Sequence, residues 1–468
     1  MNMVRWATLL TDWQSGQGAL YMRLAQAFRR NIEQGALAPA EQLPAERVLA
    51  ELLGLSRSTV VAAYEQLAAD QWVTRRRGSG THVSAAAPRK TSVLTLRTPL
   101  QSASASELDF TIAVPLLDDC QRTWLKNAAQ DGFQESLYHP LGLPELRALL
   151  AEQYTHGGLP TTPEQVIITS GAQQAISLVA ATFLHRGDTA LLETPTYFGA
   201  IDVFRAAGAR LVGVAVGEQG VSPGDFTRLA RQHMPRLAFL TPTFQNPTGT
   251  VMPPAARQRL AHALTELNLP TIEDETLAEL PFEGQTLPRV ASFNPAAPII
   301  NVGSLTKLYW AGLRVGWMRV PHSYRPALVQ AKTLADFGGS VLTQYLGLQL
   351  LQNLPSLRER RRASIQPARD LLAALLREQL PDWTFTLPGG GQYLWVKLPT
   401  PHASSFTHHA ARYGVRLFPG ASMSVGELPD SFLRLPFTLP PEQLPEAVRR
   451  LKAAWNDFGQ RPGQERLA

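Results

Sequence analysis

The amino-acid sequence predicts a multidomain protein, in which a small and mostly helical N-terminal domain precedes a larger α/β domain. Within the first 83 residues, three short helical patterns are followed by a β-prone hairpin. Residues 160–334 alternate apolar runs with helical patterns, which is typical of a mainly parallel sheet covered by helices. At 468 residues, the chain is also longer than one simple core usually accommodates.

The composition is that of a globular protein with little cysteine chemistry. Hydrophobic residues make up 44% of the chain and charged residues 18%, so apolar material for a core is ample. The single cysteine, Cys120, excludes an internal disulfide and a cysteine-based zinc site, which favours a reducing compartment. The first fourteen residues do not have the pattern of a secretory signal, and no apolar run approaches a membrane span. We therefore expect a cytoplasmic protein without a metal centre.

Positive charge is concentrated near the N-terminus. Residues 1–90 hold 11 Lys/Arg and 7 Asp/Glu, a net charge of +4, whereas residues 91–468 hold the other 33 and 31, a net charge of +2. This uneven distribution indicates a polyanionic partner for the N-terminal region.

Three helices are expected in the N-terminal domain. The first ends at Gly35, and the second begins near Pro44 and ends at a Gly54 cap. Ser56 can cap the third helix, which covers residues 57–70. Two helices joined by a short turn that contains glycine form a helix-turn-helix arrangement.

A basic hairpin follows these helices. Two β-prone arms flank Gly78-Ser79-Gly80, and Arg75, Arg76 and Arg77 lie at the tip without an acidic neighbour. Three arginines alone are also compatible with a solvated surface hairpin. Together with the helices and the local charge, they predict a winged helix-turn-helix that binds double-stranded DNA.

The stretch from Gly18 to Val83 is similar to the DNA-binding domain of GntR-family regulators. The resemblance implies that Arg47 and Arg57 contact DNA and that Ser58 and Thr59 open the recognition helix. The N-terminal residues of such a helix enter the major groove, and wing arginines grip phosphates.

These patterns suggest the domain boundaries. We assign residues 1–83 to the DNA-binding domain and residues 84–107, which are rich in Ala, Ser, Thr and Pro, to a linker. Residues 108–468 form the second domain, with a large part at about 160–334 and a small α/β part at about 335–468.

The most informative stretch of the second domain follows a short apolar run, Ile299 to Val302, which reads as a buried strand. Ser304, Lys307 and Arg314 come next, in surroundings that are otherwise apolar or small. An amine held in an apolar site can attack a carbonyl and form a Schiff base, and an arginine holds a phosphate well. The set suggests pyridoxal 5′-phosphate (PLP), although alone it is also compatible with a capped loop and an ordinary ion pair.

This stretch resembles the active-site lysine segment of fold-type I PLP-dependent enzymes, the aspartate aminotransferase superfamily. Its spacing from lysine to arginine is most similar to the aminotransferase-like domain of MocR/GabR-type regulators. The resemblance implies that Lys307 binds PLP, that Asp274 faces the pyridine nitrogen and that Asn246 faces the phenolic oxygen. Tyr197 would stack on the pyridine ring.

The resemblance also implies a phosphate site and a contribution from a partner subunit. Gly171, Ala172 and Gln173 match the phosphate loop, at a strand-to-helix junction whose free amides attract anions. Tyr138 matches a tyrosine that reaches the cofactor phosphate of the partner, although an aromatic residue packing a loop is an equal alternative.

In the C-terminal part, Arg434 matches the arginine that pairs with the α-carboxylate of a substrate. An exposed arginine on a strand is the alternative. Residues 385–399 read as a strand hairpin, and we expect an irregular tail from Asn456 to Ala468.

Two positions depart from the family pattern. Thr276 and Leu277 stand where the family usually has a tyrosine that also touches the phenolic oxygen, and Ala113 stands where it has a glycine near the substrate carboxylate. Whether the domain catalyses transamination at a useful rate is therefore left open.

The expected protein is a PLP-binding transcription regulator that senses PLP, an amino-bearing effector or both through Lys307. Its expected partners are double-stranded DNA and an amino acid or related effector, and the resemblance implies a head-to-tail homodimer. The alternative is an active amino acid aminotransferase with an accessory DNA-binding domain.

Overall fold

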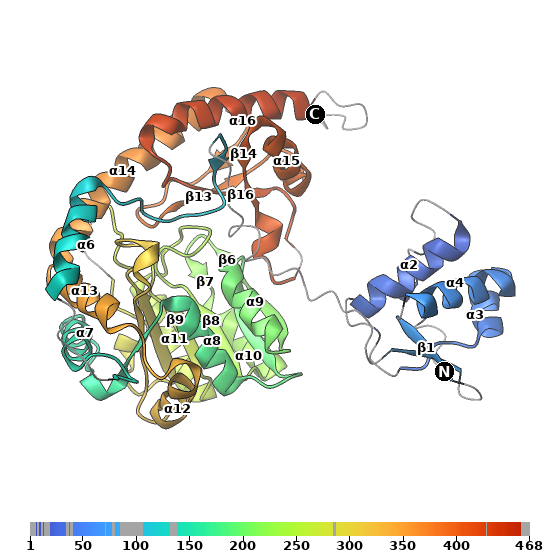
Figure 1. Cartoon of the computed structure of the whole chain (residues 1–468), viewed down its shortest axis with the longest axis horizontal. Coiled ribbons are helices and arrows are strands. Elements are labelled where there is room, and N and C mark those ends of the chain that lie inside the picture. The colour runs from blue at the N-terminus through green and yellow to red at the C-terminus, as the bar shows by residue number, and fades with distance from the viewer. Residues whose placement is uncertain are drawn as a thin grey trace. The chain divides into compact units, whose positions relative to one another are not determined.

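The structure, a computed structural model, divides into two compact units, Met1–Leu94 and Thr95–Ala468 (Figure 1). The residues it describes are 6, 9–10, 13, 19–33, 37, 41–70, 72–76, 80–84, 106–131, 138–283, 287–426 and 428–459. None of the helices in these ranges is long and apolar enough to cross a membrane.

The first unit contains the three expected helices, α2 (Leu20–Glu33), α3 (Glu46–Leu53) and α4 (Arg57–Ala69). Gly54 caps α3 in the left-handed conformation, with φ of 64°, which costs glycine little because it has no Cβ. Ser56 caps α4 by accepting a hydrogen bond from the Thr59 amide at 3.1 Å. Apolar side chains of all three helices share one core, which includes Phe28 and Tyr64. Both predicted caps are confirmed.

The hairpin follows as β1 (Val73–Arg76) and β2 (Gly80–Val83), paired antiparallel with Val73 opposite Val83. Trp72, Val73 and Val83 pack into the core of the helices. The sequence prediction placed three arginines at the tip. Arg77 lies outside the described residues, as do the side chains of Arg75 and Arg76.

The second unit is built on an eight-stranded sheet with the strand order β4-β11-β10-β9-β8-β5-β6-β7. The neighbours β10·β9, β9·β8, β8·β5 and β5·β6 are parallel, whereas β11 and β7 run antiparallel to their neighbours. The predicted mainly parallel sheet is therefore confirmed. The strands are β4 (Val166–Thr169), β5 (Thr189–Thr194), β6 (Arg210–Gly217), β7 (Gly220–Val221), β8 (Leu237–Leu240), β9 (Thr271–Asp274), β10 (Ile299–Ser304) and β11 (Gly316–Arg319).

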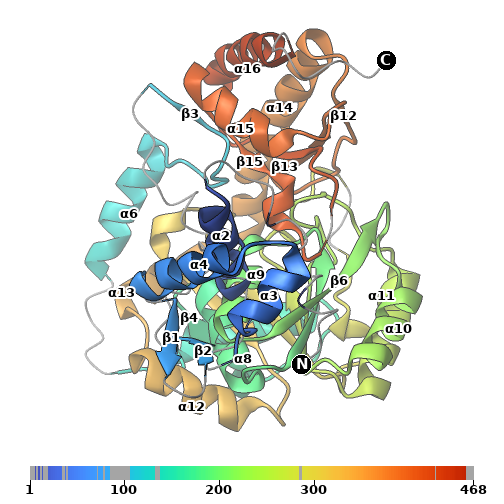
Figure 2. The ribbon, with the colours of Figure 1, turned by 90° about the vertical axis from the view of Figure 1, so that its right-hand side faces the viewer.

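Helices cover both faces of this sheet. On one face, apolar residues of α8 (Ala172–Phe183), α9 (Phe198–Ala206) and α12 (Arg325–Asp336) form a core with the strands. On the other, α10 (Pro223–His233) and α11 (Pro254–Leu267) pack side by side (Figure 2), joined by Tyr154 of α7 (Pro144–His156). Successive residues of β5 alternate between the two cores: Ala190 and Leu192 face one, and Leu191 faces the other.

The C-terminal part has its own four-stranded sheet, in the order β12-β13-β16-β15. The pairing of β12 with β13 confirms the predicted hairpin. Long helices border this part (Figure 1). Its elements are α13 (Val341–Gln352), α14 (Leu354–Gln379), β12 (Thr384–Phe385), β13 (Tyr393–Lys397), α15 (Ala403–Ala410), β14 (Val415–Arg416), β15 (Phe418–Pro419), β16 (Phe432–Pro436) and α16 (Leu444–Gly459).

One segment from the start of the second unit crosses to this C-terminal part. There β3 (Leu108–Asp109) pairs in parallel with β14, and the chain then continues to α6 (Asp119–Asp131). An aspartate and an arginine reinforce the pairing, since Arg416 Nη1 donates to Asp109 Oδ2 at 3.0 Å.

The expectation of an irregular tail from Asn456 is wrong for its first four residues. Helix α16 continues to Gly459 because Phe458 is buried and its ring packs edge-on against Phe406, 5.5 Å between centroids. Residues 460–468 lie outside the described residues.

Candidate functional site

A cavity of about 110 Å³ lies where the parallel strands end. The carboxyl ends of neighbouring parallel strands meet at one edge of a sheet, which is where α/β folds bind ligands. Asp274 is the last residue of β9 and Ser304 the last of β10. The cavity is lined by Ala172, Gln173, Tyr197, Asn246, Asp274, Thr276, Leu277, Ser304, Thr306, Lys307, Arg314 and Tyr393.

Lys307 lies in the turn that follows β10, and its side chain is half-buried. Its Nζ donates a hydrogen bond of 2.7 Å to the backbone carbonyl of Ala113. Ala113, where the family pattern would have a glycine, thus contacts the lysine through its main chain.

The residues expected to hold a phosphate gather at one end of the cavity. Helix α8 begins at Ala172 after Gly171, whose φ is +115°, and the first amides of a helix have no intrahelical partner. A Cβ on Gly171 would lie 3.0 Å from Arg314 Nη2, so the guanidinium lies next to this helix start. Arg314 is exposed and has no ion pair or hydrogen bond within the described ranges, which leaves it able to hold an anion.

Ser304 and Thr306 complete this end. Ser304 Oγ donates to the Val315 carbonyl at 3.1 Å and accepts from the Thr306 amide at 3.1 Å. These bonds fix the turn that leads to Lys307.

The residues expected around the cofactor ring are buried. Asp274 is 5% exposed, and burial raises the pKa of its carboxyl group, partly offset by hydrogen bonds from Thr276. Tyr197 donates its hydroxyl proton to Gln173 Oε1 at 3.0 Å. Burial raises the pKa of Tyr197 as well. Asn246 Oδ1 is buried without a hydrogen-bond partner among the described residues, and such a group normally has one.

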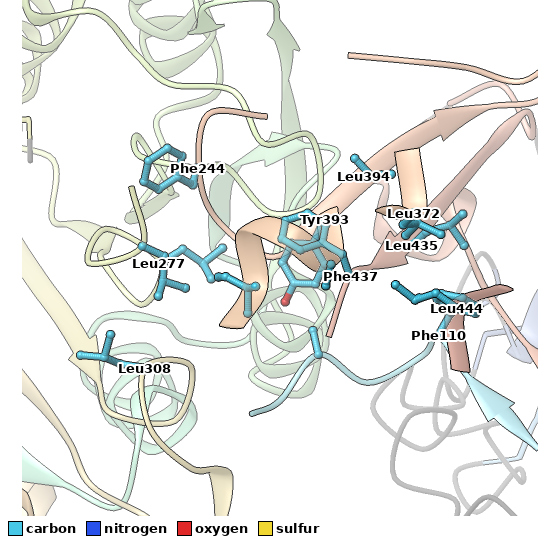
Figure 3. Close-up of a cluster of buried hydrophobic side chains, with 14 of the residues drawn as sticks. Phe110, Phe244, Leu277, Leu308, Leu372, Tyr393, Leu394, Leu435, Phe437 and Leu444 are labelled. Carbon is cyan, nitrogen blue, oxygen red and sulfur yellow. The ribbon is translucent and has the colours of Figure 1, made fainter. Parts of the chain in front are cut away.

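Sequence reasoning did not anticipate Tyr393, a cavity-lining residue that comes from the C-terminal part. In Figure 3 its ring lies between Phe244 and Leu277 on one side and Leu394 on the other, all in one apolar cluster. No motif signals this tyrosine, because it reaches the cavity only through the packing of two parts of the chain.

Arg434 is buried rather than exposed, at 2%. Its guanidinium carbon lies 4.7–5.4 Å from the ring centroids of Phe198, Tyr393 and Phe418. Its Nη2 donates to the Thr111 carbonyl at 2.7 Å, and its Nε has no partner within the described part of the chain. Burial lowers the pKa of Arg434, and a buried cation without a counter-ion favours an anionic ligand.

Tyr138 is not among the residues that line the cavity. It is 82% exposed, and its ring packs edge-on against Phe337, 6.0 Å between centroids.

In the first unit, the expected DNA contacts lie on the two helices of the helix-turn-helix. Arg47 on α3 and Arg57 and Ser58 at the start of α4 are exposed, and Thr59 is half-buried. Arg57 forms a 3.6 Å ion pair with Glu46.

Comparison with known proteins identifies both units. Residues 106–451 match the family model "Aminotransferase class I and II". The chain belongs to this family. Residues 20–83 match "Bacterial regulatory proteins, gntR family", so this aminotransferase-family chain also carries a GntR-type DNA-binding domain. The combination is that of MocR-type GntR regulators.

The relatives of this chain include a transaminase and a probable regulatory protein. A 2-aminoadipate transaminase of Thermus thermophilus is 37% identical over 67% of this chain and 79% of its own length. A probable rhizopine catabolism regulatory protein, MocR, of Rhizobium meliloti is 29% identical over 78% of each chain. The crystal structure of LysN, an α-aminoadipate aminotransferase of T. thermophilus complexed with N-(5′-phosphopyridoxyl)-L-leucine, is 32% identical and covers 78% of this chain and 95% of its own, with a TM-score of 0.72.

The cofactor of this domain is PLP, and the cavity fits it. Arg314 and the start of α8 suit its phosphate, and the buried Asp274 suits its pyridine nitrogen. Asn246 Oδ1, which has no partner among the described residues, can accept a hydrogen bond from the ring hydroxyl. Lys307 lines the same cavity and would supply the amine. When bound, PLP supplies an aldehyde that condenses with amines and a ring that accepts electrons.

Proposed function

We propose that this PLP-binding transcription regulator senses an amino acid or a related amine through Lys307 and Arg434, and that it acts on DNA as a head-to-tail homodimer. The roles proposed for the other cavity residues are those of the family motif, with Tyr138 contributing to the site of the partner subunit. Its 82% exposure supports that role, because a side chain that serves another subunit must be accessible.

One observation carries the sensing proposal. Residues 109–114, here called the crossing segment, contact both groups that an amino acid would engage. The carbonyl of Ala113 accepts from Lys307 Nζ and the carbonyl of Thr111 accepts from Arg434 Nη2, both at 2.7 Å. The amine of an amino acid can take the place of Lys307 Nζ. Its carboxylate competes with the Thr111 carbonyl for Arg434.

The crossing segment also supports a route to DNA. One residue, Leu108, separates it from residues 84–107, which join it to the DNA-binding unit. At its start, Asp109 accepts from Arg416 Nη1 at 3.0 Å and from Thr111 Oγ1 at 2.6 Å. An effector that replaces the contacts of Thr111 and Ala113 favours a different position of the segment, and it shifts DNA affinity only if it binds one arrangement more tightly.

The test is a spectral titration of the PLP-loaded protein with single amino acids, with and without a DNA fragment selected by this protein from a random library. We expect one class of amino acid to change both the visible spectrum and the DNA affinity. Arg434→Ala should weaken the spectral change while PLP stays bound. Spectral change at the wild-type site without any effect on DNA affinity would refute the sensing role.

The alternative, an active aminotransferase, is supported by Lys307 and by the transaminase relative. Thr276 and Leu277 both line the cavity and neither provides the phenolic hydroxyl usual in the family. Formation of keto acids from a panel of amino acids measures this activity directly.

A further inference from the structure

Two side chains of the C-terminal part hold the main chain of Lys307. Arg361 of α14 donates from Nε to the Lys307 carbonyl at 3.2 Å, and Gln392, directly before β13, donates to it from Nε2 at 3.1 Å. Both lone pairs of that carbonyl are therefore used.

Arg361 differs from the arginines around it. It is 8% exposed, it has no acidic partner in the described ranges, and its Nη2 is buried without a hydrogen bond. Burial lowers the pKa of Arg361 to about 10. Its neighbours Arg358 and Arg362 instead form ion pairs, with Glu279 and Glu359. A desolvated cation without a counter-ion destabilises a fold, so its presence beside Lys307 calls for a role other than stability.

The two contacts also connect Lys307 to the strands that carry the carboxylate arginine. Gln392 precedes Tyr393, which lines the cavity, and Trp395 of the same strand lies opposite Arg434 of β16. A displacement of β13 and β16 therefore acts on the Lys307 backbone through Gln392, and α14 adds a second connection through Arg361.

We propose that Arg361 and Gln392 are positioning residues that hold the Lys307 backbone and couple it to the C-terminal part; this inference rests on the proposed role of Lys307. They set the direction in which Nζ enters the cavity, and they relay carboxylate binding at Arg434 to the lysine. Neither side chain lines the cavity or contacts the reacting atoms.

The test compares Arg361→Met with the matched control Arg362→Met, which removes the same chemical group one position along the helix. The readouts are the PLP dissociation constant and the pH midpoint of the visible absorption of bound PLP. We expect Arg361→Met to weaken PLP binding about 10-fold or more, since a hydrogen bond from a charged donor is lost. The midpoint should rise, because removing a nearby positive charge favours a protonated nitrogen. The PLP dissociation constant of Arg362→Met should stay within about 2-fold of the wild-type value, because an exposed ion pair contributes little.

Two further variants keep the outcome decisive if Arg361→Met does not fold. Gln392→Leu should also weaken PLP binding. Arg361→Lys should keep the pH midpoint of the wild-type protein, since the charge remains, but its affinity for PLP should be lower. Unchanged PLP affinity in folded Gln392→Leu and Arg361→Lys would overturn the proposal, as would equal effects of Arg361→Met and Arg362→Met. Borohydride trapping in the wild-type protein distinguishes a failure of this inference from a failure of the proposed function. PLP trapped at a residue other than Lys307 refutes the proposed function itself.

Discussion

At the residue scale, the proposed chemistry depends on one lysine. Among the lysines that the structure describes, Lys307 alone follows a buried strand with hydroxyls and an arginine nearby, and it lines the cavity together with Asp274 and Arg314.

Lys307→Ala should abolish the borohydride-trappable bond to PLP. The fold should persist, because a half-buried lysine contributes little to the core. Mass spectrometry of reduced, digested protein locates the bond, and Lys126→Ala is the control at an exposed lysine outside the cavity. Trapped cofactor at another lysine would show the assignment to be wrong.

A buried carboxyl group near the site should make stability depend on pH. Glu193 at the end of β5 is 1% exposed, and burial raises its pKa from 4.5 to about 8. It accepts hydrogen bonds from the Thr241 amide and from Gln245 Nε2. A raised pKa means that the folded state binds this proton more tightly than the unfolded state, so the contribution of Glu193 to stability falls as pH rises from about 4.5 to about 8.

Glu193→Gln removes this titration and should flatten the pH dependence over that window. The wild-type free energy of unfolding should fall relative to the variant by up to about 1.4 kcal/mol per pH unit. Denaturant unfolding at pH 5, 6, 7 and 8 measures the difference. Parallel curves for the two proteins would contradict a raised pKa at Glu193.

Some site residues could be predicted from the sequence, and others could not. Ser304 could be placed at a strand end because a short apolar run precedes it, and Asp274 could be assigned from the family resemblance. Tyr393, Arg361 and Gln392 could not be found, because their contacts join segments far apart in the sequence, 54 residues for Arg361 and 85 for Gln392 with Lys307. The sequence around Arg361 contains several arginines, and only packing shows that Arg361 is buried whereas Arg362 is exposed.

At the scale of elements, we expect α4 to be the recognition helix of the GntR-type domain, and the start of α4 depends on a cap. Elements of this unit were predictable because caps, turns and apolar spacing are local signals, as at Gly54 and Ser56. The pairing of β3 with β14 was not predictable, because it joins strands of two residues across more than 300 positions.

Ser56→Ala should destabilise the DNA-binding unit by about 1 kcal/mol, because the Thr59 amide loses its acceptor. The unfolding transition of the N-terminal unit, followed by thermal denaturation, measures the loss. Ser58→Ala is the control, since its hydroxyl makes only an exposed bond to Ser56, and it should cost less than about 0.5 kcal/mol. Equal losses would exclude the capping role.

The wing and the recognition helix should act differently on DNA. Removing one wing arginine, for example Arg76→Ala, should weaken binding to all sequences alike and lower the salt slope by about 0.9. Arg57→Ala should instead narrow the affinity gap between selected and random DNA, because base contacts specify sequence. Fluorescence anisotropy at several salt concentrations measures both. Wing variants that lose only specific binding would reverse the two roles.

At the scale of the whole molecule, we propose that an aminotransferase-type ligand site acts on the DNA-binding unit that precedes it in the chain. The carbonyls of the crossing segment contact Lys307 and Arg434 within the ligand site, and this segment lies next in sequence to the residues that lead to the DNA-binding unit. The fold class of both units was predictable from motif order and strand patterns. The proposed coupling was not, because the contacts that support it are hydrogen bonds of backbone carbonyls, which carry no sequence signal.

The most direct test of this coupling is the affinity of the PLP-loaded protein for its selected DNA fragment, measured with and without the amino acid that changes its spectrum. The account predicts a change of about 5- to 150-fold, as is typical of allosteric coupling, and predicts its loss in Arg434→Ala. The contradicting result is a DNA affinity that this amino acid does not change, together with its conversion to a keto acid by the wild-type protein at ordinary aminotransferase rates.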